Sequence, residues 1–273
     1  MFSFHQHNEI TFSTADCICA VGGVRHCFST RTGGISPAPY DSLNFAGTTG
    51  DTQENIVRNF HLLGDAVGFD ARRVVCCRQI HGKRVEIAAL EHGGRIENDL
   101  RPFDADGLIT DVPDLPLAVF GADCPTALFC DPVTHAVGAC HAGWRGTALG
   151  IVSEVIRAME KTYGAKAENI RAAISPAIGK CCFETDENVP LAMRASLGDA
   201  VEPMIEKTGE KYHVDLKEIN RLWLLRTGVA PEHIAVHSHC TACRPDLYWS
   251  HRKMGLARGG MTALILRTKE DNE

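Results

Sequence analysis

Short runs of β-branched and apolar residues, each bounded by turn residues, recur along most of this sequence and most constrain its fold. Such runs predict strands at residues 73–78, 85–90, 107–110, 117–120, 126–130, 135–140, 170–175, 234–238 and 262–267. Apolar residues at helical spacing are rarer and predict helices at residues 52–67, 147–163 and 215–227, with a weaker pattern at 186–197. Because the strands cluster and do not alternate one for one with helices, the pattern favours an α+β fold over a doubly wound sheet.

Length and composition bound the organisation of the chain. It has 273 residues, of which 44% are hydrophobic, and it shows neither an internal repeat nor a Pro/Gly/Ser-rich linker. We therefore expect one domain spanning residues 1–273 with a proper hydrophobic core. A formal charge of −6 and a pI of about 6.1 disfavour a duplex nucleic acid partner, because binding one requires a basic face.

Location follows from what the sequence lacks. No run reaches the roughly 18 apolar residues of a membrane span, and the N-terminus shows no basic region followed by an apolar run. We expect a cytoplasmic protein without membrane contact. The 12 cysteines are then expected to be thiols or metal ligands rather than disulfides.

Three short segments combine glycine with reactive side chains: RQIHGKRV around His81, GADCPTALFCDP around Cys124 and GACHAGWRGT around His141. The residues DPVT at 131–134 are typical of a turn between two strands. If residues 131 and 134 close this hairpin, Cys124 faces His141 across its open end, with Cβ atoms roughly 4.5–5.5 Å apart. A bulge would shift the register, and a slip of one residue would put the two side chains on opposite faces.

A thiolate and an imidazole at that separation can share one metal ion. Zinc accepts sulfur and nitrogen ligands together, and a catalytic zinc keeps one coordination position open. His81 is the natural third ligand, because Gly82 beside it leaves room for a substrate. The alternative is that His81 and His141 cap strand ends with ordinary hydrogen bonds, and these residues alone leave both possibilities open.

Two arginines lie next to glycines and predict binding of an anion. Arg145 lies in the loop 142–146, directly before the helix expected to begin at residue 147, whose free N–H groups form an anion site. Arg31 precedes two glycines in FSTRTGG. Both guanidinium groups suit bidentate hydrogen bonds to a phosphate, and the alternative for each is a solvated or structural role.

Four further cysteines raise the question of a second zinc site: Cys181, Cys182, Cys240 and Cys243. Adjacent cysteines are poor chelators, so the sequence disfavours that four-thiolate site. Instead, we expect the segment 237–253 to line a pocket, with Tyr248 and Trp249 packing and His251 or Arg252 reaching in.

Motifs in a fixed order cover nearly the whole chain: FSTRTGG, SLNF, QIHG, DADGLIT, ADCPTALFCDP, HAGWRGT, PAIGKCCFE and CTACRPDLYWSHR. In these motifs and their order the chain resembles the laccase-domain or polyphenol oxidase family. Members of this family are more recently described as multifunctional purine nucleoside enzymes. The resemblance implies a single layered domain of mixed β-sheet with flanking helices, similar to the catalytic domain of cytotoxic necrotizing factor toxins. The sequence departs from the family pattern at Ser175, Trp249 and Lys253, which bears on substrate preference.

The resemblance also implies chemistry. It implies a zinc ion bound by His81, Cys124 and His141, in agreement with the hairpin argument. The implied reactions are phosphorolysis of adenosine, inosine, guanosine and methylthioadenosine, and hydrolytic deamination of adenosine. The partners expected are therefore a nucleoside and phosphate, for a monomer or weak homo-oligomer, and copper can compete for the zinc site.

Candidate residues for these reactions lie beside the metal ligands. The expected catalytic residues are Cys124, Arg31 and Asp123, and the expected substrate-binding residues are Asn44, Arg145 and His251. Arg31 and Arg145 would bind phosphate, and Asn44 would fix the ribose or the base. Asp123 would shuttle the proton when water activated by the metal attacks C6 of the purine, with a turn-stabilising role as the alternative.

Three other classes of function compete with this interpretation. A copper-dependent polyphenol oxidase is suggested by the older family name, but conventional laccases need more His-x-His pairs and about twice this length. A cysteine hydrolase would use Cys124 as nucleophile and His141 as base, without a metal. A non-catalytic binding protein is disfavoured by glycines that converge with Arg, His and Cys.

Overall fold

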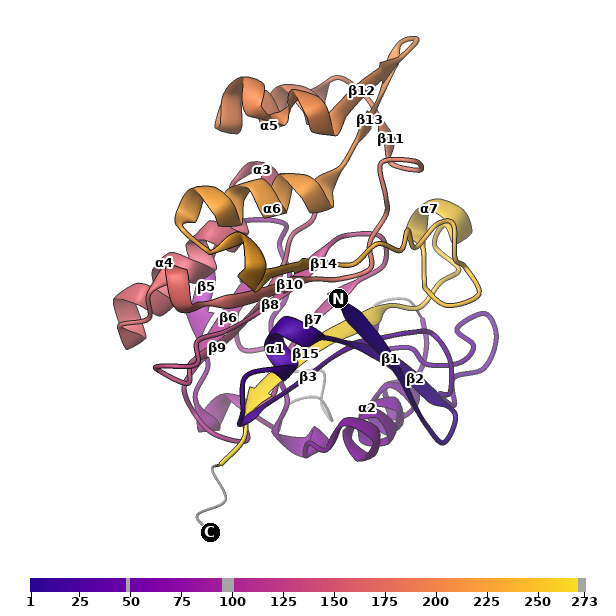
Figure 1. Ribbon diagram of the computed structural model, residues 1–273. Coiled ribbons are helices and arrows are strands. Elements are labelled where there is room, and N and C mark those ends of the chain that lie inside the picture. The colour runs from indigo at the N-terminus through magenta and orange to yellow at the C-terminus, as the bar shows by residue number, and fades with distance from the viewer. Residues whose placement is uncertain (48–49, 95–100, 270–273) are drawn as a thin grey trace.

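The computed structural model describes residues 1–47, 50–94 and 101–269, and two six-stranded sheets stacked face to face form its centre (Figure 1). In sheet order, the first contains β1 (Phe2–His7), β2 (Ile10–Ala15), β3 (Val24–Ser29), β15 (Met261–Arg267), β7 (Leu117–Gly121) and β4 (Val75–Cys76). The second contains β14 (Ile234–Val236), β10 (Arg171–Ile174), β8 (Thr126–Cys130), β9 (Val137–His141), β6 (Gly107–Thr110) and β5 (Val85–Ile87). Both sheets are mixed, because each combines antiparallel pairs with a parallel pair.

The apolar runs of the sequence arise because the central strands are buried on both faces. In β15, Ala263 and Ile265 face the core between the two sheets, whereas Leu264 and Leu266 face a second core on the outer side. Strand side chains alternate between faces, so a strand covered on both sides is apolar at nearly every position. This burial is why continuous apolar runs, rather than alternating ones, mark the strands of this chain.

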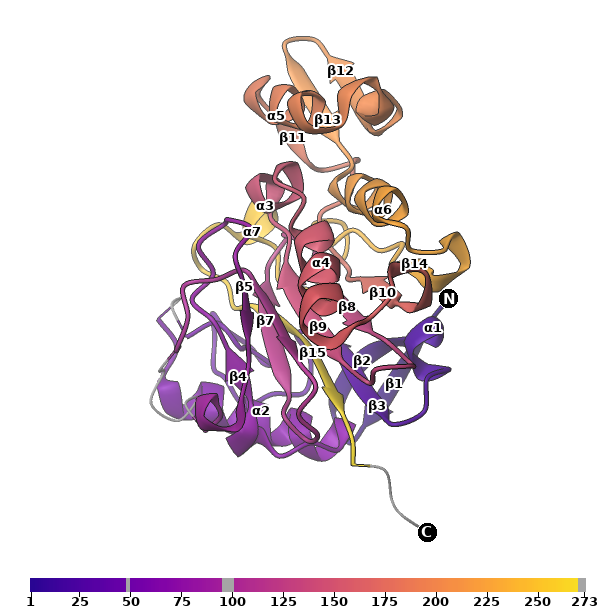
Figure 2. The same ribbon diagram turned by 90° about the vertical axis from the view of Figure 1, so that its left-hand side faces the viewer.

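Helices cover the outer faces, so the fold has helix, sheet, sheet and helix layers (Figure 2). Helix α2 (Gln53–Val67) packs on the first sheet and begins at Thr52, whose side chain accepts the Asn55 N–H. Helices α4 (Ile151–Tyr163) and α6 (Leu216–Thr227) pack on the second sheet. The α+β class predicted from the sequence is confirmed.

A small third sheet lies beyond this sandwich, above α6 in Figure 1. It contains β11 (Glu184–Thr185), β13 (Lys211–Val214) and β12 (Ile205–Thr208), and α5 (Asn188–Leu197) packs with it over a separate apolar cluster. The remaining short helices are α1 (Asp16–Cys19), α3 (Trp144–Ala148) and α7 (His251–Met254).

Several predicted elements differ from the structure. The N-terminal strands β1, β2 and β3 and the third sheet were not predicted, and the run at 73–78 forms only the two-residue strand β4. The helix predicted at 147–163 is broken into α3 and α4 at Gly150, which has φ 72°, a left-handed conformation. A Cβ at Gly150 would lie 3.2 Å from the Trp223 ring, so close packing as well as backbone geometry requires glycine there.

The predicted register of the β8–β9 hairpin is wrong by two residues. His141 pairs with Thr126 rather than with Cys124. The turn is longer than predicted: Asp131 closes it with Ala136, and the Asp131 carboxylate accepts the Val133 N–H at 3.0 Å. A shift of two residues preserves the face on which each side chain lies, so the predicted approach of Cys124 to His141 survives this error. Among the described residues, no helix is long and apolar enough to cross a membrane.

Candidate metal centre and substrate cavity

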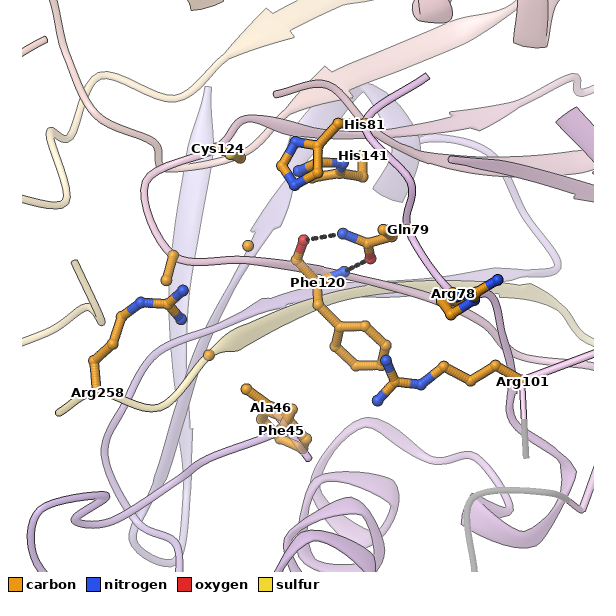
Figure 3. Close-up of a pocket in the computed structure, with 13 residues that line it drawn as sticks. Phe45, Ala46, Arg78, Gln79, His81, Arg101, Phe120, Cys124, His141 and Arg258 are labelled. Carbon is orange, nitrogen blue, oxygen red and sulfur yellow. Dashed lines mark hydrogen bonds between the residues drawn. The ribbon is translucent and has the colours of Figure 1, made fainter. Parts of the chain in front are cut away.

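Three side chains from three separate connections meet at one end of the sandwich (Figure 3). His81 lies between β4 and β5, Cys124 lies just before β8, and His141 is the last residue of β9. Their potential ligand atoms all lie within 4.8 Å of one another, and the two imidazole rings are nearly perpendicular at 88°. The structure thus brings together the three residues that the sequence nominated as metal ligands.

The buried carboxylate of Asp106 holds two of these residues in place. Its Oδ1 lies 2.9 Å from His141 Nδ1 and accepts the His81 backbone N–H at 3.0 Å, while its Oδ2 accepts the Gly82 N–H at 2.6 Å. A carboxylate accepts hydrogen bonds only, so His141 carries its proton on Nδ1. Nε2 of His141 is then the nitrogen that a metal ion would bind, in place of a proton, and this arrangement is typical of metal-binding histidines.

Backbone strain accompanies this arrangement. His81 has φ 58° and Asp123 has φ 89°, and both are non-glycine residues in the left-handed region. Such strain costs roughly 1–3 kcal/mol per residue and persists where the surroundings enforce it. Here the carboxylate of Asp106 holds the His81 backbone, which aims the imidazole at Cys124 and His141.

The electrostatics of the protein alone distinguish the two histidines. Burial and the neighbouring His141 lower the pKa of His81, so its imidazole is neutral at pH 7. Burial also disfavours the charged form of His141, but hydrogen bonds to Asp106 and Cys124 outweigh it and raise the pKa to about 9. Although burial opposes ionisation of Asp106, its hydrogen bonds to His141 and Gly82 hold its pKa below the usual value.

The space between the three side chains fits a small ion. A Cβ placed on Gly143 would lie 3.0 Å from His81 Nδ1, 3.1 Å from His141 Cε1 and 3.2 Å from Cys124 Sγ. Glycine therefore keeps this point open, where any other residue would fill it. Two imidazoles and a thiolate with one open side match the ligand number and ligand types of a catalytic zinc, so the residues fit the metal implied by the resemblance.

Two cavities adjoin at this centre. The first, about 280 Å³, is lined by arginine, glutamine and aromatic side chains: Arg78, Gln79, Arg101, Phe120, Phe45 and Arg258. The second, about 320 Å³, is more apolar, with Trp144, Ile178, Phe183 and Leu216 beside Asp123, His251 and Arg252. His81, Cys124 and Arg258 line both. Each volume is close to the lower limit of small-molecule sites, roughly 300 Å³.

Arg31 and Asn44 lie outside both cavities, contrary to the expectation that they contact substrate. The Arg31 guanidinium donates to the carbonyl oxygens of Asp41 and Pro245 and lies 3.8 Å from the centre of the Trp249 ring. Asn44 is fully buried, and its Oδ1 accepts the Gly260 N–H at 2.9 Å. Both side chains are occupied in holding loops together, because their polar atoms are already bonded within the protein.

The structure places the other three predicted site residues, Asp123, Arg145 and His251, in different surroundings. Asp123 lines the second cavity, but its carboxylate oxygens accept Thr241 Oγ1 and the Arg252 N–H, each at 2.6 Å, which favours the turn-stabilising alternative over a proton shuttle. Arg145 is exposed and lines neither cavity. It lies within α3, which begins at Trp144 and so about one turn before the predicted start at residue 147. His251 lines the second cavity as predicted.

Sequence reasoning missed several residues of the site. Asp106 lies in the DADGLIT motif. The signal that could have identified it is a second aspartate, two residues after Asp104, directly before the buried strand β6. Arg258 precedes Gly259 and Gly260, an arrangement like that which singled out Arg31. Gln79 exchanges two hydrogen bonds with the Phe120 backbone, at 2.9 and 2.7 Å, and so joins the His81 loop to β7 (Figure 3).

A layered α+β fold with two cavities that meet at a His/Cys/His cluster, which could bind a metal ion, has the geometry of an enzyme site. Comparison with known proteins identifies the family. A family model described as multi-copper polyphenol oxidoreductase laccase matches residues 25–268, and the chain belongs to this family. Proteins with similar sequences are named purine nucleoside phosphorylases.

These relatives match over most of their length. Purine nucleoside phosphorylase YlmD of Geobacillus stearothermophilus is 37% identical over 245 residues, which cover 89% of each chain. Purine nucleoside phosphorylase YfiH of Escherichia coli is 35% identical over 231 residues, covering 85% of this chain and 89% of the relative. The crystal structure of YlmD from G. stearothermophilus superposes with a TM-score of 0.90 at 34% identity, covering 97% of this chain and 99% of that one.

Proposed function

We propose that this protein is a zinc-dependent purine nucleoside phosphorylase acting on adenosine, inosine, guanosine and S-methyl-5′-thioadenosine, with hydrolytic deamination of adenosine as a second activity. The observation that carries this proposal is the meeting of two cavities at His81, Cys124 and Arg258. One bound nucleoside there would face a ligand set for a metal, a guanidinium cation and two chambers of different polarity. The names of the relatives support the reaction class.

His81, Cys124 and His141 would hold the zinc, which would supply a Lewis acid with an open coordination position. The deaminase activity has support from the donor set, because zinc held by histidine and cysteine is the metal site of nucleobase deaminases. Asp106 would direct Nε2 of His141 to the metal by accepting a hydrogen bond from its Nδ1–H.

The arginine-lined chamber suits phosphate. Arg258 is half-buried, and although burial lowers its pKa, Asp123 and Cys124 favour its charged form. Arg101 lines the same chamber, as does Arg78, whose guanidinium is paired with the Asp104 carboxylate (Figure 3). A guanidinium presents paired N–H donors that match phosphate oxygens, so we propose that phosphate binds here, rather than at the Arg31 and Arg145 positions expected from sequence.

The second chamber suits the purine. Trp144 and Phe183 line it with aromatic rings, and aromatic pairs are favourable in offset or edge-on geometry. The Arg258 Nε donates to Nδ1 of His251 at 3.4 Å, which leaves the Nε2 proton of His251 to be donated. We propose that His251 donates this hydrogen bond to the purine as negative charge builds on the leaving base, the charge-stabilising role of a preorganised donor.

One observation favours a second candidate, a metal-free cysteine hydrolase. The Cys124 sulfur lies within 4.8 Å of a ring nitrogen of His141, and Nδ1 of the same imidazole lies 2.9 Å from the Asp106 carboxylate. Nucleophile, base and orienting acid have this order in cysteine hydrolases. The hydrolase has no role for His81, whereas a metal site uses it as the third ligand.

The test combines metal analysis with product analysis on one untagged preparation. Zinc and copper are counted by mass spectrometry, and the protein is incubated with each nucleoside, with and without phosphate, while products are separated by chromatography. We expect free base to form only with phosphate, inosine to form from adenosine without it, and bound zinc to fall in Cys124→Ala and His81→Ala. Arg258→Met should raise KM for phosphate at least tenfold, and Arg258→Lys should restore part of it.

Three outcomes would overturn the proposal. Turnover that persists unchanged in metal-free protein, with Cys124 readily alkylated by iodoacetamide, supports the hydrolase. Bound copper with oxidation of phenols and no nucleoside cleavage supports the polyphenol oxidase. Base release that does not require phosphate excludes phosphorolysis.

A further inference from the structure

A second cluster of soft metal ligands lies outside the site described above. Cys181 and Cys182 lie in the connection between β10 and β11, and Cys240 and Cys243 lie in the connection between β14 and α7. The four sulfur atoms all lie within 4.8 Å of one another. We propose that these four cysteines bind a structural zinc ion, independently of the catalytic function proposed above.

Adjacent cysteines generally chelate one ion poorly, but here both sulfur atoms lie close to the sulfur of Cys243. The Cys243 Sγ lies 3.7 Å from the sulfur of Cys181 and 3.4 Å from that of Cys182, so both neighbours reach the same point. A zinc ion with Zn–S bonds of about 2.3 Å in tetrahedral geometry separates its sulfur ligands by roughly 3.8 Å. The observed separations are close to that value.

The turn at residues 179–183 explains how both neighbours point inward. The carbonyl oxygen of Gly179 accepts the N–H groups of Cys182 and Phe183, each at 2.9 Å, and closes a tight turn around the pair. A Cβ on Gly179 would lie 3.2 Å from the Cβ of Cys240 and 3.3 Å from the sulfur of Cys181. Glycine therefore lets this backbone approach the other cysteine loop closely, and a larger residue would crowd the sulfur atoms.

The surroundings favour thiolates at this cluster. Cys240 is buried, and its sulfur accepts the Gly179 N–H at 3.2 Å. Four thiolates around a zinc ion leave two net negative charges, which low-dielectric surroundings penalise unless cations lie nearby. The buried ammonium of Lys217 donates to the carbonyl oxygen of His239, the residue before Cys240, at 3.0 Å, and the Arg252 guanidinium donates to the Cys182 carbonyl oxygen at 2.9 Å.

Metal binding displaces thiol protons and couples the site to folding, so a divalent cation satisfies the whole cluster at once. A disulfide would join only two of the four sulfur atoms and leave the other two unexplained.

This zinc would join two loops that form one wall of the second cavity. One loop carries Ile178 and Phe183, and the other continues to His251 and Arg252, and all four residues line that cavity. The backbone bridge between Ala177 and Cys240 and the contact from Arg252 to Cys182 already join the same loops. The metal therefore stabilises the shape of the cavity without contacting the substrate.

Zinc counting tests the proposal on the full-length, untagged protein grown with added zinc and purified with a reductant. We expect Cys243→Ser and Cys240→Ser each to lose about one zinc per chain, while Cys19→Ser, which removes an exposed cysteine elsewhere, loses none. His81→Ala should keep the cysteine-bound zinc. If the catalytic zinc proposal fails, wild type and His81→Ala contain the same single zinc, so the two proposals fail separately.

Cobalt substitution supplies a second measurement. Protein reconstituted with Co²⁺ should show thiolate-to-cobalt charge-transfer absorption that persists in His81→Ala and falls sharply in Cys243→Ser. Should Cys243→Ser not fold, the exposed Cys181→Ser variant serves in its place. Zinc content that is unchanged by both Cys240→Ser and Cys181→Ser would falsify the proposal. Iron with acid-labile sulfide, or a Cys182–Cys243 disulfide in protein alkylated at lysis, would also overturn it.

Discussion

Substituting Asp106 by asparagine tests the argument that this carboxylate organises the metal centre. The change preserves shape and volume but removes the charge and replaces one acceptor oxygen by an NH₂ group. Asp106 accepts from His141 and His81 on Oδ1 and from Gly82 and Ile80 on Oδ2. Since an amide has only one oxygen, one pair of donors must then face an NH₂ group.

The magnitude follows from the bonds that are lost. A hydrogen bond to a charged group contributes about 1.5–3 kcal/mol, and an unsatisfied buried donor costs a similar amount. We therefore expect Asp106→Asn to lower the free energy of unfolding by about 3 kcal/mol. Removing the partner of a metal-binding histidine typically lowers metal affinity about 10–100-fold, so we expect zinc affinity to fall in that range.

Competition with a chromophoric chelator measures the zinc affinity, and urea unfolding measures the stability. The matched control is Asp131→Asn, because Asp131 is also buried and caps the opposite end of the β8–β9 hairpin through Val133 and Thr134. The control should lose stability but keep its zinc affinity. If both variants bind zinc as wild type does, Asp106 does not organise the centre and the reasoning is refuted.

Three further predictions test other parts of the structure. Gly143→Ala places a methyl group among the three metal ligands and should lower zinc affinity at least tenfold, whereas Gly22→Ala, with open space around it, should not, as the same competition assay measures. Asn44→Ala should lower the free energy of unfolding by about 2–3 kcal/mol in urea, because it leaves buried N–H groups without acceptors. Burial and the nearby His5 lower the pKa of His26 from 6.5 to about 4. Between these two pH values the unfolded chain binds a proton that the folded chain does not. The free energy of unfolding is therefore unaffected above about pH 6.5 and falls by on the order of 3 kcal/mol as the pH drops to about 4. Urea unfolding at several pH values should show a smaller loss in His26→Gln.

The metal centre was predictable because its signal is local. His81 and His141 each stand beside glycines in dense motifs, and the hairpin argument brought Cys124 near His141. The predicted hairpin places both side chains on the correct face but pairs the strands in the wrong register, because the Asp131 side chain extends the turn to Ala136. The metal bound there stays a prediction, as does the likeness to the toxin domain.

The surrounding site was less predictable because its residues depend on contacts distant in sequence. Arg31 and Arg258 both precede glycine pairs, and nothing local separates the one that stacks on Trp249 from the one that lines the cavities. The adjacent cysteines appear unsuited to one ion until the turn closed by Gly179 is known. In each case a backbone conformation or a partner far along the chain decides where the side chain points.

The position of the site follows from how the sheets are buried. Strands covered on both faces have no position for a polar catalytic side chain within them, so such residues gather where strands begin and end. Gly121 ends β7 opposite the start of β15 at Met261, and His141 ends β9 opposite the start of β8 at Thr126. Because of these two pairs, Cys124 and Arg258 lie at the same end of the sandwich. Cys124 lies in the connection between β7 and β8, and Arg258 lies in the segment that leads into β15. A substitution that exposes one face of these central strands should therefore displace the metal centre and both cavities together.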